Sequence, residues 1–536
     1  MIPNHSDGLL HIESPTLISR CCKDHLHRGL SVTLVSAVMI LFLHTELNAQ
    51  RITYESLRAR DRQPEFFVEH LIAANPDTSA GKLLLISTFR IENGFLSFRR
   101  YRERDSDREG PQFFAEPTLR FSMSRLTGDA GDDRPEPESI ESGDFRMHTW
   151  SEMVFADTYE QTRSSGIYLQ NMVQRPAEPG TYRMRTEAQS GSRKRSAERS
   201  LVKVADTSDI DTAYLYFLDS REDVTFPKSP HTQAGLDVPG NGDETDLTNT
   251  PGNGDELASA HQAPLMNMGT NVFFGRDHQL AIWIPFTEAE SRYELVIDQL
   301  SVRRGDTTAT RRALHVGLDT LISSRDFIPV VAMHDDRPGF GMINAYGPYR
   351  SGRLYHLSVP NSRFENAYYR IRVKRISATE GERADRPVIM AERVYRSLWL
   401  DMPVSLLNLD VAINMLRFIL PEEQLRQFRR GSRDDRERRF REFWNERDPT
   451  PGREYNELMV EYYRRIDYAF EHFTTPQNPG YDSDQGLVYI RHGEPQSRER
   501  IFPANQPARE TWYYEGRSFV FEATTGFGDF RLISRP

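Results

Sequence analysis

Short stretches in which apolar and polar residues alternate fill much of the chain after its first fifty residues. Residues 180–185 alternate in this way, whereas residues 82–91 form an almost continuous apolar run. Alternation with a period of two is typical of a half-buried strand, and a short continuous run is typical of a fully buried one. The pair Asn93-Gly94 follows the second stretch and predicts a tight hairpin turn. These short strands and turn signals predict an antiparallel β-sandwich of the immunoglobulin-like type over residues 50–206.

A second β-rich region, residues 207–392, repeats this pattern and predicts a second antiparallel β-sandwich. Within it, the low-complexity stretch 236–262 contains the sequence Pro-Gly-Asn-Gly-Asp-Glu twice. Its glycines and acidic oxygens could hold calcium, but the spacing is not that of an EF-hand loop. The composition is instead typical of a disordered surface loop, which we expect there.

The hydrophobic period changes to nearly four after Leu398. Apolar residues recur at helical spacing between residues 406 and 419 and again between residues 455 and 473. Pro421, followed by two glutamates, predicts the start of a further helix, and the mixed charges from 433 to 446 predict a solvated one. Four short strands are then predicted at 487–490, 511–514, 518–522 and 529–533. Residues 393–536 therefore predict a helical segment followed by a small α+β domain.

Aromatic and polar residues of this last region form a pattern that is similar to a known family. The pattern is carried by Phe443-Trp444, by Arg447-Asp448-Pro449, by the turn 480–486 and by Trp512-Tyr513-Tyr514. The region resembles the GWxTD-domain family of secreted bacterial proteins. The resemblance implies a fold and export from the cell, but no catalytic residue. The motif residues, which we interpret as structural, are Trp444, Arg447, Asp448, Gly480, Tyr481, Ser483, Asp484, Gly486 and Trp512.

The motif that gives the family its name is altered in this chain. Tyr481 stands where the family has tryptophan, and Ser483 stands where it has threonine, while Gly480, Asp484 and Gly486 are kept. Both exchanges keep the chemistry, because an aromatic ring and a turn-capping hydroxyl remain. A turn that serves stability tolerates such exchanges better than a site that is tuned to one substrate. We therefore interpret this turn as architecture.

The amino-terminal residues carry a targeting signal. Lys23 and Arg28 precede an apolar run over residues 30–43, which is too short for the ~20 residues that cross a bilayer. This pattern predicts a signal peptide over residues 1–49 with cleavage after Ala49, and hence a secreted or periplasmic protein. The alternative is that the run is kept as a short membrane anchor. After signal removal we expect no integral membrane span.

Charge and composition exclude several classes of function. A formal net charge of −10, with 27% charged residues, argues against a nucleic-acid-binding protein. Both cysteines, Cys21 and Cys22, lie in the leader, so we expect no disulfide, thiol nucleophile or cysteine ligand in the exported chain. The histidines after the leader are too far apart in sequence for a local zinc motif. We therefore predict no cofactor and no bound metal.

Two short motifs suggest chemistry, but neither has the context that it needs. Residues 487–494 resemble the strand and Arg-His-Gly motif of the histidine phosphatases, yet only 44 residues follow His492 and none is histidine. Residues 482–486 alternate oxygen donors as calcium loops do, but the bidentate glutamate that should follow is missing. An ordinary Asp-capped turn is the better interpretation of this second stretch.

We therefore predict an exported, non-catalytic interaction or assembly protein of the cell envelope, with other envelope proteins as its partners. The alternative is a hydrolase whose site lies between the sandwich region and the C-terminal domain and uses His492, Glu494 and Asp484. Convergence of these three side chains in a pocket would favour the hydrolase. An exposed apolar or aromatic patch would favour the interaction protein.

Overall fold

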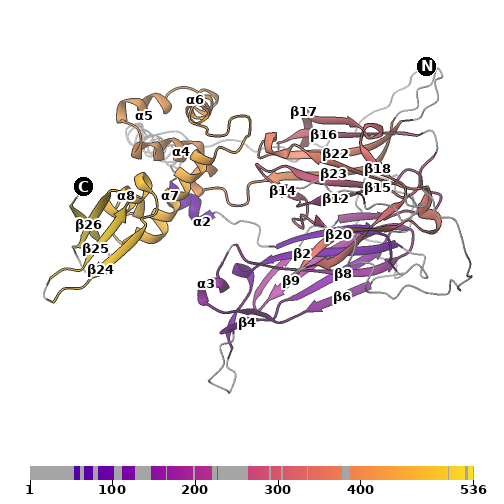
Figure 1. Ribbon diagram of the computed structural model, residues 1–536, viewed down its shortest axis with the longest axis horizontal. Helices are drawn as coiled ribbons and strands as arrows, with labels where there is room; N and C mark the ends of the chain where they lie inside the picture. Colours follow the sequence, from indigo (N-terminus) through magenta and orange to yellow (C-terminus); the bar gives the residue numbers. More distant parts are fainter. Residues whose placement is uncertain are drawn as a thin grey trace, which may run out of the picture. The chain divides into compact units, whose positions relative to one another are not determined.

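The computed structural model shows a mainly β protein with several antiparallel sheets, a helical segment near residues 409–492 and a strand region at its C-terminal end (Figure 1). The mainly β fold class predicted from the sequence is confirmed. The structure describes residues 53–60, 66–76, 83–101, 111–126, 146–164, 166–196, 200–219, 226, 263–288, 291–303, 306–334, 336–376, 387–504, 506–524 and 529–534. The predicted signal peptide and the low-complexity stretch 236–262 lie outside these residues.

The chain divides into two compact units, Met1–Ala59 and Arg60–Pro536. The described residues at the end of the first unit form helix α2 (Tyr54–Arg60), which begins with a reciprocal pair of hydrogen bonds. The Ser56 N–H donates to the Thr53 hydroxyl at 3.3 Å, and the Thr53 N–H donates to the Ser56 hydroxyl at 3.1 Å. Among the helices of the described residues, none has the length and apolar character needed to cross a membrane.

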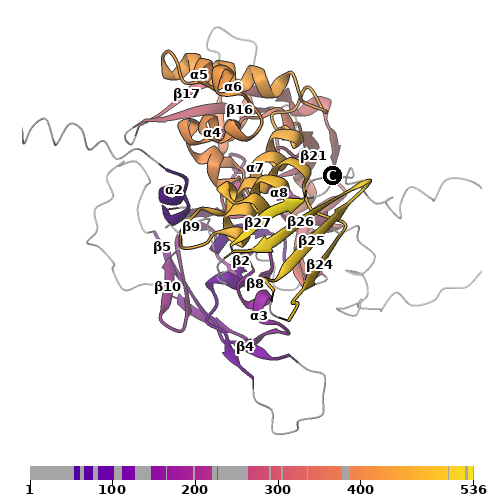
Figure 2. The same cartoon turned by 90° about the vertical axis from the view of Figure 1, so that its left-hand side faces the viewer.

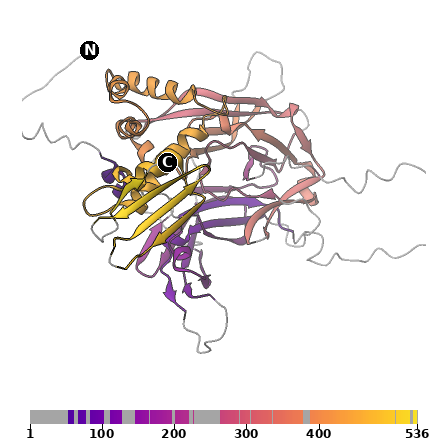
Figure 3. The same cartoon turned by 60° about the vertical axis from the view of Figure 1, so that its left-hand side comes forward.

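The first half of the β-rich region contains one small sheet, described with the candidate site, and two larger antiparallel sheets (Figure 3). One has the order β1-β2-β8, and the other has the order β10-β9-β5-β6, with β11 also paired to β9. Phe89 of β2 and Phe121 of β5 belong to one core, with their ring centroids 6.0 Å apart. The bounds are β1 (Phe66–Ala73), β2 (Leu83–Glu92), β5 (Thr118–Arg125), β6 (Arg146–Ser151), β8 (Tyr168–Ala177), β9 (Gly180–Ser190), β10 (Arg193–Ser196) and β11 (Ser200–Val204).

The predicted two-residue hairpin turn at Asn93-Gly94 is wrong. Residues Asn93–Phe95 form a 3-10 helix, η2, and neither Asn93 nor Gly94 has the positive φ that such a turn requires. The Asn93 side chain donates a hydrogen bond to the Gln161 carbonyl at 3.1 Å, and Phe95 is fully buried. The Asn93 hydrogen bond and the burial of Phe95 hold this segment in place, and the residues that follow do not pair with β2, whose neighbours are β1 and β8.

Three sheets form the second half of the β-rich region. Their orders are β12-β15-β21-β18, β13-β20-β19 and β14-β23-β22-β16-β17, and β14 pairs with β23 in parallel. The bounds are β12 (Tyr214–Leu218), β13 (Ala263–Pro264), β14 (Asn271–Phe273), β15 (His278–Ile284), β16 (Arg292–Arg303), β17 (Asp306–Gly317), β18 (Ile322–Ser324), β19 (Phe327–His334), β20 (Arg337–Asn344), β21 (Arg353–Val359), β22 (Tyr368–Ile376) and β23 (Val388–Leu398).

One hydrophobic core contains side chains from both predicted sandwich regions. Tyr182 and Met184, which precede residue 206, share this core with Trp283 and Phe340, which follow it. The Tyr216 hydroxyl of β12 also donates a hydrogen bond to the Ile72 carbonyl of β1. The two regions are therefore joined by a common apolar core, while the exact boundaries 50–206, 207–392 and 393–536 stay predictions.

The helical segment follows β23 and is held together by buried tyrosines. Tyr462 and Tyr463 of α7 donate their hydroxyls to the carbonyls of Met415 and Ala412, at 2.6 and 2.8 Å. Both hydroxyls are thereby satisfied in an apolar interior, where an unpaired one would be costly. The helices are α4 (Leu409–Met415), α5 (Glu422–Phe428), α6 (Arg433–Asn445), α7 (Glu457–Phe473) and α8 (Asp484–His492), with the 3-10 turns η8 (Val404–Leu407), η9 (Leu416–Phe418) and η10 (Gly480–Asp482).

The predicted strand at 487–490 is wrong, because these residues belong to helix α8. Ser483 caps this helix by accepting a hydrogen bond from the Gly486 N–H at 2.9 Å, and Asp484 opens its first turn. A short apolar run is compatible with either a strand or a buried helix, so its periodicity alone does not decide between them. The N-terminal cap and the acidic first turn were the signals that favoured the helix.

The C-terminal sheet has the order β24-β25-β26-β27, and it lies beside α7 and α8 (Figure 2). Three of its strands agree with the prediction, including the hairpin whose turn contains Gly516 at a φ of +73°. The fourth strand, β24, takes the place of the one predicted at 487–490. The bounds are β24 (Ser497–Ile501), β25 (Arg509–Tyr514), β26 (Arg517–Ala523) and β27 (Phe530–Ser534).

Candidate functional site

The altered motif turn lies where α7, η10 and α8 meet. Its aromatic residue, Tyr481, is buried and packs on Phe470 of α7 and Phe418 of η9, with ring centroids 5.9 and 6.2 Å away. Arg417 covers the Tyr481 ring at 5.4 Å and forms an ion pair with Asp482 at 2.7 Å. The ring therefore joins three helical pieces rather than facing a cavity.

Hydrogen bonds between side chains and the backbone fix the rest of the turn. The Gly480 N–H donates to the Thr474 hydroxyl at 2.9 Å, and the Ser483 hydroxyl donates to the Gly480 carbonyl at 2.7 Å. The Asp484 carboxylate accepts the Leu532 N–H of β27 at 2.9 Å, which ties the start of α8 to the C-terminal sheet. Every one of these bonds is internal, as expected for a turn that serves the fold.

The three residues of the hydrolase alternative are not brought together. Asp484 is the first residue of α8 and His492 is its last, so a rise of ~1.5 Å per residue puts them ~12 Å apart along the axis. His492 packs on Phe519 with ring centroids 5.0 Å apart, and Glu494 is exposed. Burial lowers the pKa of His492, and the nearby charges of Arg517, Arg491 and Arg465 lower it further. Among the described residues, no carboxylate forms a hydrogen bond or ion pair with His492.

If Asp484 has a structural role in the turn, the stability that is lost when it is replaced should depend mainly on whether the new side chain can accept a hydrogen bond, and less on its charge. Asp484→Ala removes the acceptor for the Leu532 N–H and the acid at the N-terminus of α8, so we expect a loss of about 1–3 kcal/mol in the free energy of unfolding. Asp484→Asn keeps an oxygen acceptor and should lose less than about 1 kcal/mol. Urea unfolding of both variants measures this difference. Equal losses in the two variants would show that the hydrogen bond to β27 contributes nothing.

The first part of the family pattern forms a second structural cluster at the end of α6. Trp444 is 3% exposed, and its carbonyl accepts a hydrogen bond from the Asn456 side chain at 2.7 Å. Arg447 donates to the Phe443 carbonyl at 2.8 Å and covers the Phe443 ring at 3.9 Å. Asp448 accepts the Thr450 N–H at 2.9 Å and ends the helix in a turn. The bond from Asn456 to Trp444 connects the end of α6 to the start of α7.

Trp512 is the centre of the interface between the C-terminal sheet and α7. It is fully buried, and its indole N–H donates to the Glu510 carboxylate at 2.7 Å. Arg500 of the edge strand β24 forms an ion pair with the same carboxylate, and Arg498 covers the Trp512 ring at 4.9 Å. The charge of the buried Glu510 is therefore matched by two donors, as the burial of a carboxylate requires.

A groove of about 440 Å³ separates the β-rich region from the helical segment and contains Trp444 in its wall. Phe274 and Trp399 form part of the opposite wall and are stacked, with ring centroids 5.1 Å apart. Burial and the charge of Glu365 raise the pKa of Glu454 at this groove. The lining holds no histidine and no cysteine, and Glu365 accepts a hydrogen bond from Gln299 at 3.0 Å. Aromatic side chains of both regions thus meet at this groove, beside the carboxylates of Glu365 and Glu454.

A feature that the sequence analysis missed is an exposed patch on the small sheet β3-β4-β7. The strands are β3 (Arg99–Arg100), β4 (Phe113–Ala115) and β7 (Val154–Ala156). We call its outer residues, Tyr101, Phe114, Met153 and Phe155, the aromatic patch. Met153 is 53% exposed and Phe155 is 43% exposed. The Tyr101 ring lies edge-on to Phe114 and Phe155, with centroids 5.8 and 5.7 Å away.

The register of this sheet explains why the patch faces solvent. Phe155 is paired with Phe114, and Phe114 is paired with Arg99, so these side chains share one face. Val154, which points to the other face, packs against the core that contains Phe89. In the sequence, the pattern that could have revealed the patch is the small Val154 and Ala156 alternating with the larger Met153 and Phe155. Alternation alone does not say which set is inside.

The described residues hold no group of three or more histidine, cysteine, aspartate or glutamate side chains that could bind a metal ion. The two strongest arrangements of polar residues, around Asp484 and around Glu510, consist of internal hydrogen bonds and ion pairs. The aromatic patch is, by contrast, an exposed apolar surface on one sheet face, of the kind that marks an interaction site.

Comparison with known proteins identifies one domain. Residues 405–529 match the GWxTD domain. No curated protein matches the chain. Two solved structures are similar to 62% of the chain at 9% identity and a TM-score of 0.14. They are the C-terminal domain of the Streptococcus agalactiae AgI/II polypeptide BspA, covered over 99% of its length, and a structure named BspA_C_WT, covered over 100%. TM-scores this low carry no inference about this chain.

Proposed function

We propose that this chain, which carries a GWxTD domain at residues 405–529, is a non-catalytic interaction or assembly protein of the cell envelope. In this proposal, a partner protein docks on the aromatic patch. The observation that carries it is the exposure of large apolar side chains on one outer sheet face, Met153 and Phe155, together with rings in edge-on contact beside them.

The composition of the patch supports a protein partner. Aromatic residues, methionine and arginine are enriched at the centres of protein interfaces, and isolated apolar residues elsewhere on a surface need no such explanation. Arg99, which is exposed, lies next to Phe114 on the same face and adds the cation that such interfaces favour. The edge-on ring contacts hold the side chains in place before binding, which lowers the entropy lost when a partner docks.

The proposed location in the envelope is supported by the amino-terminal sequence. The apolar run 30–43 after two basic residues, with a small residue at position 49, has the pattern of a cleaved leader. The proposal that the protein is not an enzyme is supported by the separation of Asp484 from His492 along α8 and by the internal bonds of the motif turn. Other envelope proteins are then the natural partners.

The proposal is tested by removing the apolar character of the patch. We expect Met153→Ser with Phe155→Ser to weaken binding of the partner by about 30-fold or more, which is the size of one interface hot spot. The measurement is quantitative cross-linking in envelopes of the producing cell, followed by affinity measurement with the purified partner. Because both residues are exposed, the melting temperature should change little.

A matched control replaces two equally exposed apolar residues outside the patch. Ile322 is 64% exposed and Ile533 is 50% exposed, and Ile322→Ser with Ile533→Ser should leave partner binding unchanged. If the patch variant and the control variant keep the same cross-linked partner with the same affinity, the docking site is not the patch. Turnover of a substrate that is lost in His492→Ala would instead support the hydrolase.

A further inference from the structure

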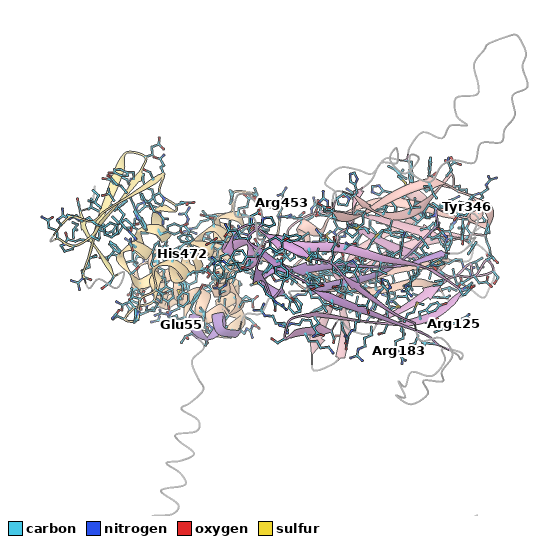
Figure 4. The ribbon with its side chains drawn as sticks, turned by 90° about the horizontal axis from the view of Figure 1, so that it is seen from below. Glu55, Arg125, Arg183, Tyr346, Arg453 and His472 are labelled. Carbon is cyan, nitrogen blue, oxygen red and sulfur yellow. The ribbon has the colours of Figure 1, made fainter. Side chains whose placement is uncertain are left out.

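The outer face of the sheet β10-β9-β5-β6, with β11, carries an excess of positive charge. The strand register places Arg185 of β9 opposite Ser122 of β5, and Arg183 opposite Ser124. The inward neighbours Tyr182 and Met184 are buried, so the arginines point outward. Figure 4 labels Arg183 at the lower edge of the strands in that view. The cations of this face are Arg120, Arg183, Arg185, Lys194 and Lys203.

Two acidic side chains partly balance these cations. Glu187 forms ion pairs with Arg185 at 2.7 Å and with Lys194 at 3.0 Å, and their charges lower the pKa of Glu187. Asp209 forms an ion pair with Lys203 at 2.6 Å. Among the described residues, the side chains of Arg120 and Arg183 form no hydrogen bond or ion pair, because Glu187, which lies opposite Arg120 on β9, is paired with Arg185 and Lys194. Five cations and two acids therefore leave a net positive face with two free guanidinium groups.

This local excess matters although the whole chain carries a formal net charge of −10. Charges on solvent-exposed groups are screened over about 8 Å at physiological ionic strength. Side chains on neighbouring strands are about 5 Å apart, so the cations of this face act together on a nearby ligand. A negatively charged ligand is the kind that this face favours.

An exposed leucine on the same face narrows the choice of ligand. Leu201 of β11 is 64% exposed and is the cross-strand partner of Arg183. An exposed face that combines free cations with a protruding apolar side chain fits the headgroup layer of an anionic membrane. The described outward positions of β5, β9 and β11 carry no aromatic ring, on which nucleic-acid bases would stack.

We infer that this face binds the surface of an anionic lipid bilayer. Arg120 and Arg183 contact lipid phosphates, and Leu201 enters the headgroup region. The interaction is peripheral and is separate from the aromatic patch, which stays available for a partner protein. It also depends on salt, because screening weakens the attraction between the arginines and the phosphates.

The test measures sedimentation of the full chain with vesicles made of equal parts phosphatidylcholine and phosphatidylglycerol. Each cation near an anionic membrane strengthens binding by about 5-fold, so Arg120→Gln with Arg183→Gln should weaken it by about 25-fold. Leu201→Ser should weaken it by a further factor of several. Vesicles of phosphatidylcholine alone should bind all variants equally and weakly. This comparison distinguishes charge-dependent binding by this face from any binding by the leader.

The matched control is Arg363→Gln with Arg453→Gln, which removes the same charge from two exposed arginines elsewhere. We expect the control to bind like the parent chain. An equal loss in both double variants, or binding that does not depend on phosphatidylglycerol, would overturn the proposal. The rival occupant is the stretch 127–145, which carries seven acidic residues. Vesicle binding that appears only after these acids are replaced by amides would assign the face to that stretch and would also overturn it.

Discussion

Gly486→Ala and Gly480→Ala are expected to unfold the C-terminal domain under conditions that the parent chain tolerates. A Cβ at Gly486 would lie 1.9 Å from the Gly480 carbonyl oxygen, and a Cβ at Gly480 would lie 1.9 Å from the Ala469 carbonyl oxygen. Both obstacles are backbone atoms of a helix or turn, which cannot rotate away as a flexible side chain can. We expect each substitution to lower the free energy of unfolding by about 3 kcal/mol or more.

Denaturant unfolding followed by tryptophan fluorescence measures this loss, because Trp444 and Trp512 report on the C-terminal domain. Gly94→Ala is a matched control, since its Cβ would lie 3.6 Å from the nearest atom and its φ is not in the left-handed region. The control should stay within about 0.5 kcal/mol of the parent. A Gly486→Ala variant that unfolds like this control would show that the two segments do not pack as closely as the structure has them.

These two glycines also show what the motif pattern could and could not reveal. The sequence supported a structural interpretation of the turn, because Tyr481 and Ser483 keep the chemistry of the residues that they replace. It could not reveal the contacts that make the glycines necessary. The Gly480 contact comes from Ala469, which lies eleven residues earlier in α7, and only the packing of the helix end against the turn brings the two together.

The same limit explains the wrong strand at 487–490. Leu487, Val488 and Ile490 are apolar and favour strands by local propensity, yet Ser483 and Asp484 cap a helix directly before them. A helix cap stabilises the helix by about 1 kcal/mol, and the burial of Val488 and Ile490 against neighbouring elements stabilises it further. Tertiary packing therefore decides a segment whose local signals conflict.

The aromatic patch could not be predicted from the sequence for a different reason. Alternation predicts that the side chains of a strand divide between two faces, but not which face meets the core. Val154 and Phe155 are both apolar, so either could have faced the core. The pairing of β4 with β7 places Phe155 on the solvent side. By contrast, the alternation of Tyr182 and Met184 with arginines was sufficient, because charge settles which face is outside.

Glu69→Ala is expected to be among the most destabilising single substitutions in the β-rich region. Glu69 is 4% exposed and forms an ion pair with Arg393 at 2.6 Å, across 324 residues of sequence. Arg393 also donates to the Gly269 carbonyl and covers the Phe217 ring at 4.7 Å. Removing the carboxylate leaves a largely buried guanidinium without its counter-charge, which costs about 3–5 kcal/mol.

The control is a more exposed ion pair, formed by Glu392, which directly precedes Arg393 in β23. Glu392, whose side chain is 44% exposed, lies 3.8 Å from Arg370, and Glu392→Ala should cost no more than about 1 kcal/mol because the contact is long and the carboxylate is solvated. The double variant Glu69→Met with Arg393→Met should recover most of the loss, since apolar replacements of both partners leave no unpaired charge. Urea unfolding of the two single variants and the double variant gives the coupling free energy directly. A Glu69→Ala loss as small as that of Glu392→Ala would mean that the buried pair does not stabilise the contact between β1 and β23, and that apolar packing and the remaining hydrogen bonds, such as the one from Tyr216 to Ile72, hold the first sheet to the second half of the β-rich region.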